Sequence, residues 1–447
     1  MNEKQLIRVR HRLQQALHPE ALNALGLATG FAKRRRTVTP ARLALTLIAA
    51  LATQPVATIA DLQRAFHCLT GCSVCYKPFY NQLAKPKFAR FMRCLFAQLL
   101  TQLTLQVLRP LPESVVAHFT DILIQDGTSA TLHPHLRERW PGRFTNRAPA
   151  ALEVHTTLSL FHDQVVRISL SADACNERRY LPRPGSLKGK LLLGDRGYED
   201  LEYCVGVQAG EGAFVFRFKR TINPQVLGCW VDGQQRENLQ GLPFQEVVQQ
   251  LAGQHADLEV EWPPKRATPK SKARPAAVRL RLVLLWNPEQ KSHLVLATNL
   301  ERARFSLAVV AQLYRLRWQV ELLFKEWKSY ANFGAVTSQN AALTEGLLWA
   351  ALSAALIKRF LAHATQAVYP GVAISTRKAA MAGREPLRRL LAAVLKPPGF
   401  TAALRELLAY LQREARRDRP KRERETGRLQ TGLAPLCGSA HWLWSHA

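Results

Sequence analysis

The sequence predicts an α/β fold: a mixed sheet with helices, interrupted by a β-rich insertion and flanked by helical regions at both ends. Two changes in hydrophobic period indicate this arrangement. Helical spacing gives way to strand-like segments near Val115, and it returns near Ser306. Between these points, short apolar runs typical of buried strands precede residues 203–297, whose segments largely alternate with period two.

The first part of the chain is predicted to be helical. Thr39-Pro40 combines a capping residue with a first-turn proline, and an apolar helix follows. Residues 43–60 carry no charge, but Gln54-Pro55 interrupts them, so we expect a buried helix and a turn rather than a membrane span. Two short helices joined by a glycine-containing turn come next, a rhythm compatible with helix-turn-helix DNA binding.

The middle of the chain holds the strand candidates. In "ILIQDGTS" and "KLLLGDRGY", an acid, Asp126 or Asp195, follows an apolar run and lies next to a glycine. The segment "ALEVHTTLSLFHDQVVRISL" predicts a hairpin with His162-Asp163 at its turn. Within the insertion, residues 263–275 ("PPKRATPKSKARP") are predicted to form a basic loop.

Charge points to a polyanionic partner. The chain has 62 Lys and Arg against 33 Asp and Glu, a formal net charge of +29 and a pI near 10.4. Nucleic acid phosphates are the commonest partner for such an excess, which is spread along the whole chain. Eight cysteines are too few for a disulfide scaffold, and the first residues do not resemble a secretory signal, so we expect a reducing cytosol.

The segment "YRLRWQVELLFKEWK" is predicted to be one helix beginning at Tyr314. At about 100° per residue, Arg317, Glu321 and Lys328 fall with Tyr314 within an arc of roughly 60°. Apolar residues cover the adjoining face, and Glu326 lies on the far side. The polar stripe could follow a phosphate backbone, or it could be a solvated face with salt bridges.

Three acids could support phosphoryl chemistry. Cleavage of a phosphodiester commonly uses two divalent metals, which need several carboxylates, and Mg²⁺ prefers oxygen ligands. Asp126 and Asp195 lie where strands would present them, and Glu321 lies on the polar stripe. Burying such charge is costly without a partner, which favours a metal, although either Asp could instead be a turn or cap residue.

These residues resemble a known family. Asp126 in "DGT", Asp195 in "DRGY", "ATNL" at 297–300 and the Tyr-x2-Arg-x3-Glu-x6-Lys pattern from Tyr314 resemble the DDE transposases of the bacterial insertion-sequence-4 family. The resemblance covers about residues 115–365. It implies a ribonuclease-H-like catalytic domain that is split by a β-rich insertion between the second Asp and the Glu.

The resemblance also implies roles for six residues. Asp126, Asp195 and Glu321 would be the catalytic ligands of two Mg²⁺ ions, with Mn²⁺ as a substitute. The phosphates of the transposon end would contact the remaining three, Tyr314, Arg317 and Lys328.

The partners implied are double-stranded DNA, namely the terminal inverted repeats of the element and target DNA, and a second copy of the chain in the synaptic complex. Cleavage would release the element through a hairpin intermediate. No membrane is involved, and the expected location is the bacterial cytoplasm, at the nucleoid.

Five regions follow from these expectations. We predict a helical DNA-binding domain (1–110), two parts of the catalytic domain (111–202 and 298–335), the β-rich insertion (203–297), and a helical C-terminal region with a basic tail (336–447).

Other candidates favour structural roles. The hairpin step would stack a flipped base on an aromatic, and a core role is the alternative for each tryptophan of the insertion: Trp230, Trp262 and Trp286. Asp121 is expected at the strand start or surface. Asp173 and Glu177 are expected in loops, with a supporting role as the alternative, and His155 in the core, with a catalytic role as the alternative. A zinc site is disfavoured by irregular spacing in "HCLTGCSVC". A DNA-binding protein without catalysis and a related metal nuclease stay open as alternatives.

Overall fold

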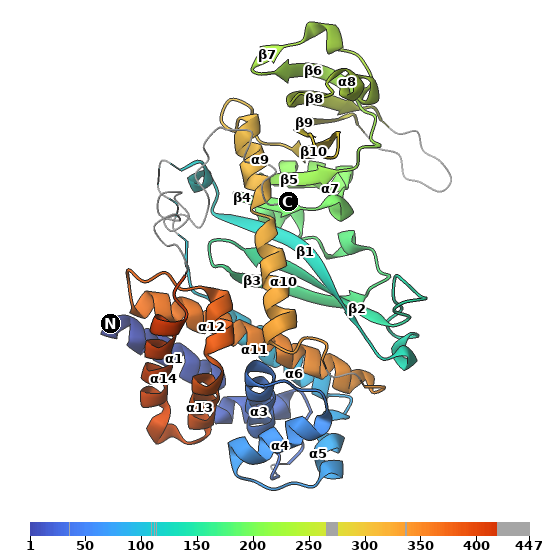
Figure 1. The fold of residues 1–447 in the computed structure, drawn as a ribbon. Helices are drawn as coiled ribbons and strands as arrows, with labels where there is room; N and C mark the ends of the chain where they lie inside the picture. Colours follow the sequence, from blue (N-terminus) through green and yellow to red (C-terminus); the bar gives the residue numbers. More distant parts are fainter. Residues whose placement is uncertain are drawn as a thin grey trace.

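Figure 1 shows the molecule as a computed structural model, with strands towards one end, most helices packed at the other, and α10 running between them. The structure describes residues 1–417 apart from 35, 109, 111, 113, 265–275 and 336–337. The predicted basic loop and most of the predicted basic tail therefore lie outside the described residues.

Among the described residues, ten strands form one sheet in the order β3-β2-β1-β4-β5-β10-β9-β8-β6-β7. Their bounds are β1 Asp121–Thr131, β2 Ala151–Ser159, β3 Gln164–Ala172, β4 Lys190–Gly194, β5 Ala213–Phe218, β6 Gln225–Val231, β7 Gln234–Gln235, β8 Ala256–Trp262, β9 Val278–Asn287 and β10 Ser292–Thr298. β4 pairs in parallel with both β1 and β5, whereas β2 runs antiparallel to β1 and β3. This order, with β2 alone reversed among its first five strands, is the ribonuclease-H-like arrangement, so the predicted fold class is confirmed.

The insertion extends this same sheet. β5 lies inside the range 203–297, yet it pairs in parallel with β4, and β10 returns beside it. The first five strands, β1 to β5, are therefore complete only at Phe218, and the strands that follow extend the same sheet beyond β5. The domain boundaries themselves stay a prediction.

Some helices pack on the sheet, and most of the others form a helical body at the end of the molecule opposite the insertion strands (Figure 1). Their bounds are α1 Glu3–Leu17, α2 Pro19–Ala28, α3 Pro40–Thr53, α4 Ile59–Thr70, α5 Tyr76–Leu83, α6 Phe88–Gln102, α7 Leu201–Ala209, α8 Phe244–Gln250, α9 Leu307–Arg315, α10 Trp318–Tyr330, α11 Ala341–Val368, α12 Thr376–Ala382, α13 Arg384–Leu395 and α14 Phe400–Glu414. α3 begins as predicted, because the Thr39 side chain accepts a hydrogen bond from the Arg42 N–H and Pro40 fills the first turn. α4 and α5 are the two predicted short helices, separated by a turn that begins at Gly71.

α11 is the central helix of the body. It packs against α3 and α6, and most of its side chains are buried. Within the described residues it is the one helix that is long and apolar enough to cross a membrane, but 78% of its apolar stretch is buried inside the protein. A buried core helix can be as long and as apolar as a membrane-spanning helix. The shorter apolar helix α3 is buried, as predicted.

The alternation of side chains along β1 sorts them onto two faces. Ile122 and Ile124 belong to the core shared with α9 and α10, whereas Leu123 belongs to the core on the opposite face. Asp126 has the parity of Ile122 and Ile124, so β1 presents its carboxylate towards α10.

One prediction about local structure is wrong. The segment beginning at Tyr314 is not one helix, because α9 ends at Arg315 and a turn at Leu316–Arg317 precedes α10. Asp121 is expected at the strand start or at the surface, and the structure places it at the strand start. It is buried at the start of β1, where its carboxylate accepts hydrogen bonds from the Ser159 hydroxyl and the Ile122 N–H.

Candidate active site

The three predicted acids come from three separate elements. Asp126 lies on β1, Asp195 directly follows β4, and Glu321 lies in the first turn of α10. Gln125 and Gly194 are register partners on the parallel strands β1 and β4, so the two Asp residues that follow them emerge side by side. α10 packs against β1 and brings Glu321 to the same place.

Arg317 joins two of these acids. Its Nη1 donates to Asp126 Oδ2 at 2.8 Å, and its Nη2 donates to Glu321 Oε1 at 2.8 Å. The guanidinium therefore lies between the carboxylates of β1 and α10, and its side chain is only 16% exposed. The turn between α9 and α10 carries Arg317 to this position.

Asp195 has weaker partners. The Tyr314 hydroxyl donates to Asp195 Oδ1 at 3.4 Å, and Arg217 Nη1 lies 3.8 Å from the same oxygen. Tyr314 and Arg317 thus both contact acids of the site, although the turn between α9 and α10 separates them. Lys328 is exposed two turns beyond Glu321, and no contact among the described residues ties it to the acids.

The electrostatics follow from this packing. Burial raises the pKa of Asp126 to about 6, Arg317 opposes that rise, and the like charges of Asp195 and Glu321 add to it. Burial also raises the pKa of the Tyr314 hydroxyl. Burial would lower the pKa of Arg317, but its neighbours, chiefly Tyr314 and Asp126, raise it overall. Asp126 is therefore a carboxylate whose negative charge lacks full compensation.

The donor set suits a hard cation, because it consists of carboxylate oxygens that repel one another. As they stand, no three His, Cys, Asp or Glu side chains of the described residues surround one point closely enough to hold an ion. Arg317 supplies a reason, since its guanidinium fills the space between Asp126 and Glu321. Release of that guanidinium would free oxygens of Asp126 and Glu321 to bind a divalent cation.

Sequence reasoning missed a group of residues beside Asp126. Glu153 on β2 is buried, and its carboxylate lies 3.4 Å from Arg143 Nη2. Burial raises the pKa of Glu153 to about 7, nearby Glu177 adds to the rise, and Arg143 opposes it. An acid within the predicted strand "ALEVHTTL" was the signal available in the sequence. Asp173 and Glu177 belong to the same network, so they are not simple loop residues.

The remaining candidates have structural partners. His155 is buried, shares a 2.8 Å hydrogen bond with the Ser171 hydroxyl and stacks on Tyr180, as expected of a core histidine. His67 lies 3.1 Å from the Val74 N–H, and the seven cysteines in the described part of the chain are free thiols.

The tryptophans of the insertion are not equivalent. Trp262 is buried on β8, and the Arg302 guanidinium covers the ring of Trp230 at 3.4 Å. Trp286 meets His293 edge-on.

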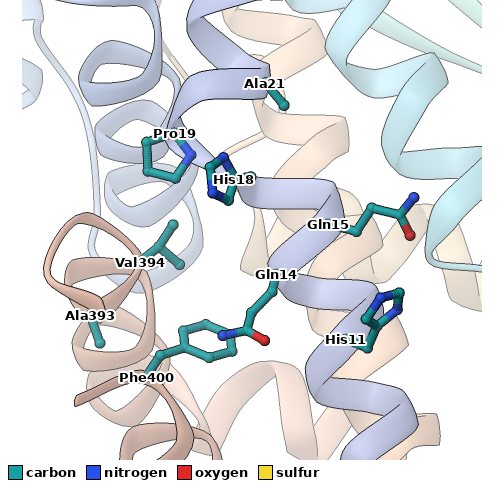
Figure 2. Close-up of a pocket in the computed structure, with 9 residues that line it drawn as sticks. All are labelled: His11, Gln14, Gln15, His18, Pro19, Ala21, Ala393, Val394 and Phe400. Atoms are coloured by element: carbon teal, nitrogen blue, oxygen red, sulfur yellow. The ribbon is translucent and has the colours of Figure 1, made fainter. Parts of the chain in front are cut away.

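A cavity of about 570 Å³ lies away from the acids, between α1, α13 and the start of α14 (Figure 2). It is lined by His11, Gln14, Gln15, His18, Pro19, Ala21, Ala393, Val394 and Phe400. No carboxylate is among these residues, so this cavity does not offer the chemistry of the acid site.

Comparison with known proteins identifies the family of the chain. Residues 117–357, which contain all three acids, match the transposase DDE domain family. The chain belongs to this family. As a DDE transposase it is a DNA-binding enzyme that cleaves and transfers DNA strands, of the kind encoded by insertion sequences.

Two relatives of this DDE transposase are similar over much of its length. The transposase for insertion sequence element IS231F of Bacillus thuringiensis subsp. israelensis is 23% identical over 350 residues, which are 71% of this chain and 72% of that protein. The transposase for insertion sequence element IS1151 of Clostridium perfringens is 22% identical over 311 residues, 59% of this chain and 65% of that protein.

Among solved structures, a piggyBac transposase synaptic complex with hairpin DNA covers 92% of this chain and 86% of its own, with a TM-score of 0.44 and 11% identity.

Proposed function

We propose that this chain is a transposase of the insertion-sequence-4 family that cuts and joins the ends of its own element, with Asp126, Asp195 and Glu321 as its catalytic residues. The observation that carries the proposal is that Asp126 and Glu321 meet at one arginine, while Asp195 emerges beside Asp126 at the end of β4. A DNA-binding protein without catalysis would have no need for acids facing a phosphate backbone. A related nuclease would not need the Tyr-Arg-Glu-Lys spacing.

Asp126, Asp195 and Glu321 would hold two Mg²⁺ ions, which Mn²⁺ can replace. Bound there, the metals would stabilise the charge that develops on the attacking and leaving oxygens of the phosphodiester. The chain's own part is to fix the three carboxylates on rigid elements and to exclude competing ligands around the half-buried Asp126.

The phosphates of the transposon end would engage Tyr314, Arg317 and Lys328. Arg317 offers a planar fork that matches two phosphate oxygens, and Lys328 offers a mobile point charge on the exposed side of α10. When DNA arrives, its phosphate would compete with Asp126 and Glu321 for the Arg317 guanidinium.

The wider reaction follows the family resemblance. Terminal inverted repeats would be paired by two copies of the chain, released through a hairpin, and joined to target DNA in the cytoplasm at the nucleoid. Residues 1–110 would supply DNA binding, with α4 and α5 as the helix-turn-helix candidate. Trp230 and Trp286 remain candidates for stacking a flipped base, whereas the burial of Trp262 favours a core role.

The test is end cleavage by purified protein and Mg²⁺ on duplexes that carry the terminal repeats flanking its coding sequence. Asp126→Ala, Asp195→Ala and Glu321→Ala should each abolish cleavage and leave DNA binding largely intact, because losing a ligand removes most of the charge stabilisation. Glu202→Ala, an exposed acid on α7, is the matched control and should cleave normally. Near-normal cleavage by any of the first three variants would remove that residue from the site, and wild-type binding without cleavage would favour the silent DNA-binding protein.

A further inference from the structure

We propose that Arg143, Glu153 and Glu177 form a clamp that sets the spacing of the Asp126 and Asp195 carboxylates by holding the two glycines that follow them. The inference rests on the proposed function, because it concerns how that site is positioned. We assign all three as positioning residues, because the contacts described below are with one another and with the backbone beside the acids.

The first contact lies directly under Asp126. Because side chains alternate along β1, Gly127 faces away from α10, towards the face of the sheet that carries Glu153. A Cβ on Gly127 would lie 2.3 Å from Glu153 Oε1, closer than any two such atoms can approach. The Glu153 carboxylate therefore occupies the space that a side chain at position 127 would need, and it would have to move if Gly127 were replaced by alanine.

The second contact repeats this arrangement beside Asp195. A Cβ on Gly197 would lie 2.6 Å from Glu177 Oε2. Arg178 Nε also donates to the Gly197 carbonyl at 3.4 Å. Each catalytic Asp is thus followed by a glycine whose empty side-chain position is filled by a glutamate from elsewhere in the chain.

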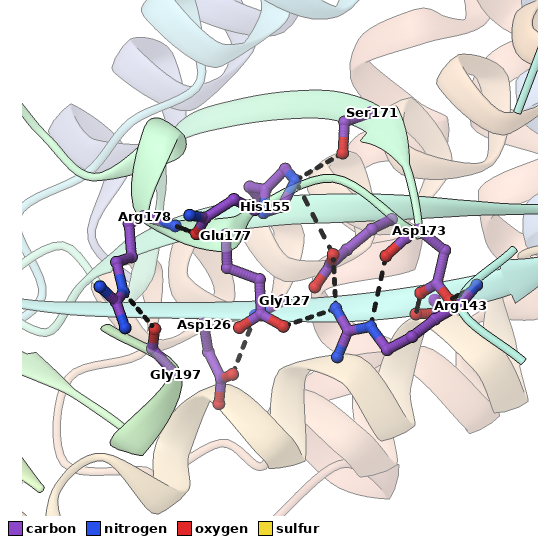
Figure 3. A network of polar contacts seen from close by, with 12 residues as sticks. Asp126, Gly127, Arg143, His155, Ser171, Asp173, Glu177, Arg178 and Gly197 are labelled. Atoms are coloured by element: carbon purple, nitrogen blue, oxygen red, sulfur yellow. Dashed lines mark hydrogen bonds and ion pairs between the residues drawn. The ribbon is translucent and has the colours of Figure 1, made fainter. Parts of the chain in front are cut away.

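Arg143 connects the two glutamates. Its Nη2 lies 3.4 Å from Glu153 Oε2 and donates to Glu177 Oε1 at 2.6 Å. The backbone N–H of Arg143 donates to Asp173 Oδ2 at 2.9 Å, and its Nε donates to the Asp173 carbonyl at 3.3 Å. Figure 3 shows Arg143 next to Asp173 on one side of the network and Gly197 next to Arg178 on the other side.

The chemistry favours a rigid link. Glu153 is buried, with 5% of its side chain exposed, so its carboxylate depends on Arg143 for compensation. Asp173 holds Arg143 in turn and accepts a hydrogen bond from the Ser129 hydroxyl on β1. The result is a chain of contacts, Gly127–Glu153–Arg143–Glu177–Gly197, that ties β1 to the segment after β4. Such partners, which orient ligands without binding the metal, typically change metal affinity or activity by about 10–100-fold when removed.

The test measures Mn²⁺ binding by calorimetry, single-turnover end cleavage, DNA binding and thermal unfolding on the full chain. Arg143→Met should weaken Mn²⁺ binding and slow cleavage by about tenfold or more, with DNA binding within about twofold. Glu177→Gln is a second variant, for use if Arg143→Met fails to fold. Glu177 is 23% exposed, so its replacement leaves less unpaired charge inside the protein. This variant should lose part of the same metal affinity.

A compensating pair sharpens the test. Gly127→Ala should impair Mn²⁺ binding and cleavage, and the double variant Gly127→Ala/Glu153→Asp should recover part of both, because the shorter acid makes room for the new methyl group. Gly185→Ala is the matched control, since nothing lies within 4 Å of its added Cβ.

Normal Mn²⁺ binding and cleavage in folded Arg143→Met and Glu177→Gln would overturn the clamp. So would a double variant no better than Gly127→Ala alone. If the wild-type protein does not cleave, and if its Mn²⁺ binding does not depend on Asp126, the proposed function fails. Failure of the clamp is different, because the wild-type protein then binds Mn²⁺ and cleaves and the clamp variants do so equally well.

Discussion

At the scale of single residues, Arg317 is the feature that most changes the view of the site. The sequence predicts it as a DNA contact on a polar stripe, and the structure places its guanidinium on the oxygens of two expected metal ligands. A cation cannot share those oxygens with a metal at no cost, because the two positive charges repel each other. Arg317 is therefore expected to compete with metal in the absence of DNA.

This competition predicts opposite effects on two measurements. Arg317→Ala should bind Mn²⁺ more tightly than wild type without DNA, by about tenfold or roughly 1.4 kcal/mol, as measured by calorimetry. The same variant should lose end cleavage by at least about tenfold, since the fork that positions phosphate is gone. Arg317→Lys keeps the charge and loses the fork, so it should not fully restore cleavage.

Lys328→Ala separates the two effects. Lys328 is exposed and touches none of the acids, so its loss should leave Mn²⁺ binding unchanged while end cleavage falls by about tenfold. Unchanged Mn²⁺ affinity in Arg317→Ala would show that the guanidinium does not oppose metal binding.

At the scale of elements, polar contacts to α11 and α12 hold the face of α10 opposite Glu321. Glu326, which the helical wheel placed on its far side, accepts hydrogen bonds from Arg359 on α11, at 2.7 Å, and from the Thr376 hydroxyl. Arg359 also pairs with Asp163 at the β2–β3 turn. The buried ion pair between Glu326 and Arg359 thus fixes α10, the helix that carries Glu321, against α11.

We therefore expect Glu326→Ala to destabilise the protein rather than to be silent. Its side chain is 14% exposed, and removing it leaves the 9% exposed Arg359 with one acid fewer, at a cost of roughly 3 kcal/mol in the free energy of unfolding. Denaturant unfolding measures this, with Glu202→Ala as the exposed control at about 0.5 kcal/mol or less. Equal stability of the two variants would show that the anchor contributes little.

The limits of sequence reasoning also lie at this scale. Asp126, Asp195 and Glu321 could be proposed from the sequence because the family resemblance adds to their strand and helix patterns, which alone leave turn, cap or surface roles open. The contact of Arg317 with Asp126 joins positions 191 residues apart, and the Arg143–Glu177 contact joins two loops, so no local period indicates either. The turn at Leu316–Arg317 was missed because both flanking segments are helical and no proline or glycine marks the break.

At the scale of the whole molecule, the net charge of +29 requires neutralisation by a polyanion. Exposed basic residues are distributed over the helical body and the sheet, so DNA binding should use several phosphate contacts. Binding measured by anisotropy should weaken by at least about tenfold between roughly 50 and 200 mM salt, because each neutralised phosphate releases counterions. A binding constant nearly flat across that range would contradict a phosphate-dominated interface.

The central claim is that Asp126, Asp195 and Glu321 bind the metals of one site. Its most direct test is single-turnover end cleavage by Asp126→Cys, Asp195→Cys and Glu321→Cys in Mg²⁺ and in Mn²⁺. A thiolate is a poor ligand for Mg²⁺ and a better one for the softer Mn²⁺. We expect each variant to be inactive in Mg²⁺ and partly active in Mn²⁺, whereas cleavage that does not depend on which metal is supplied would contradict metal binding by that residue.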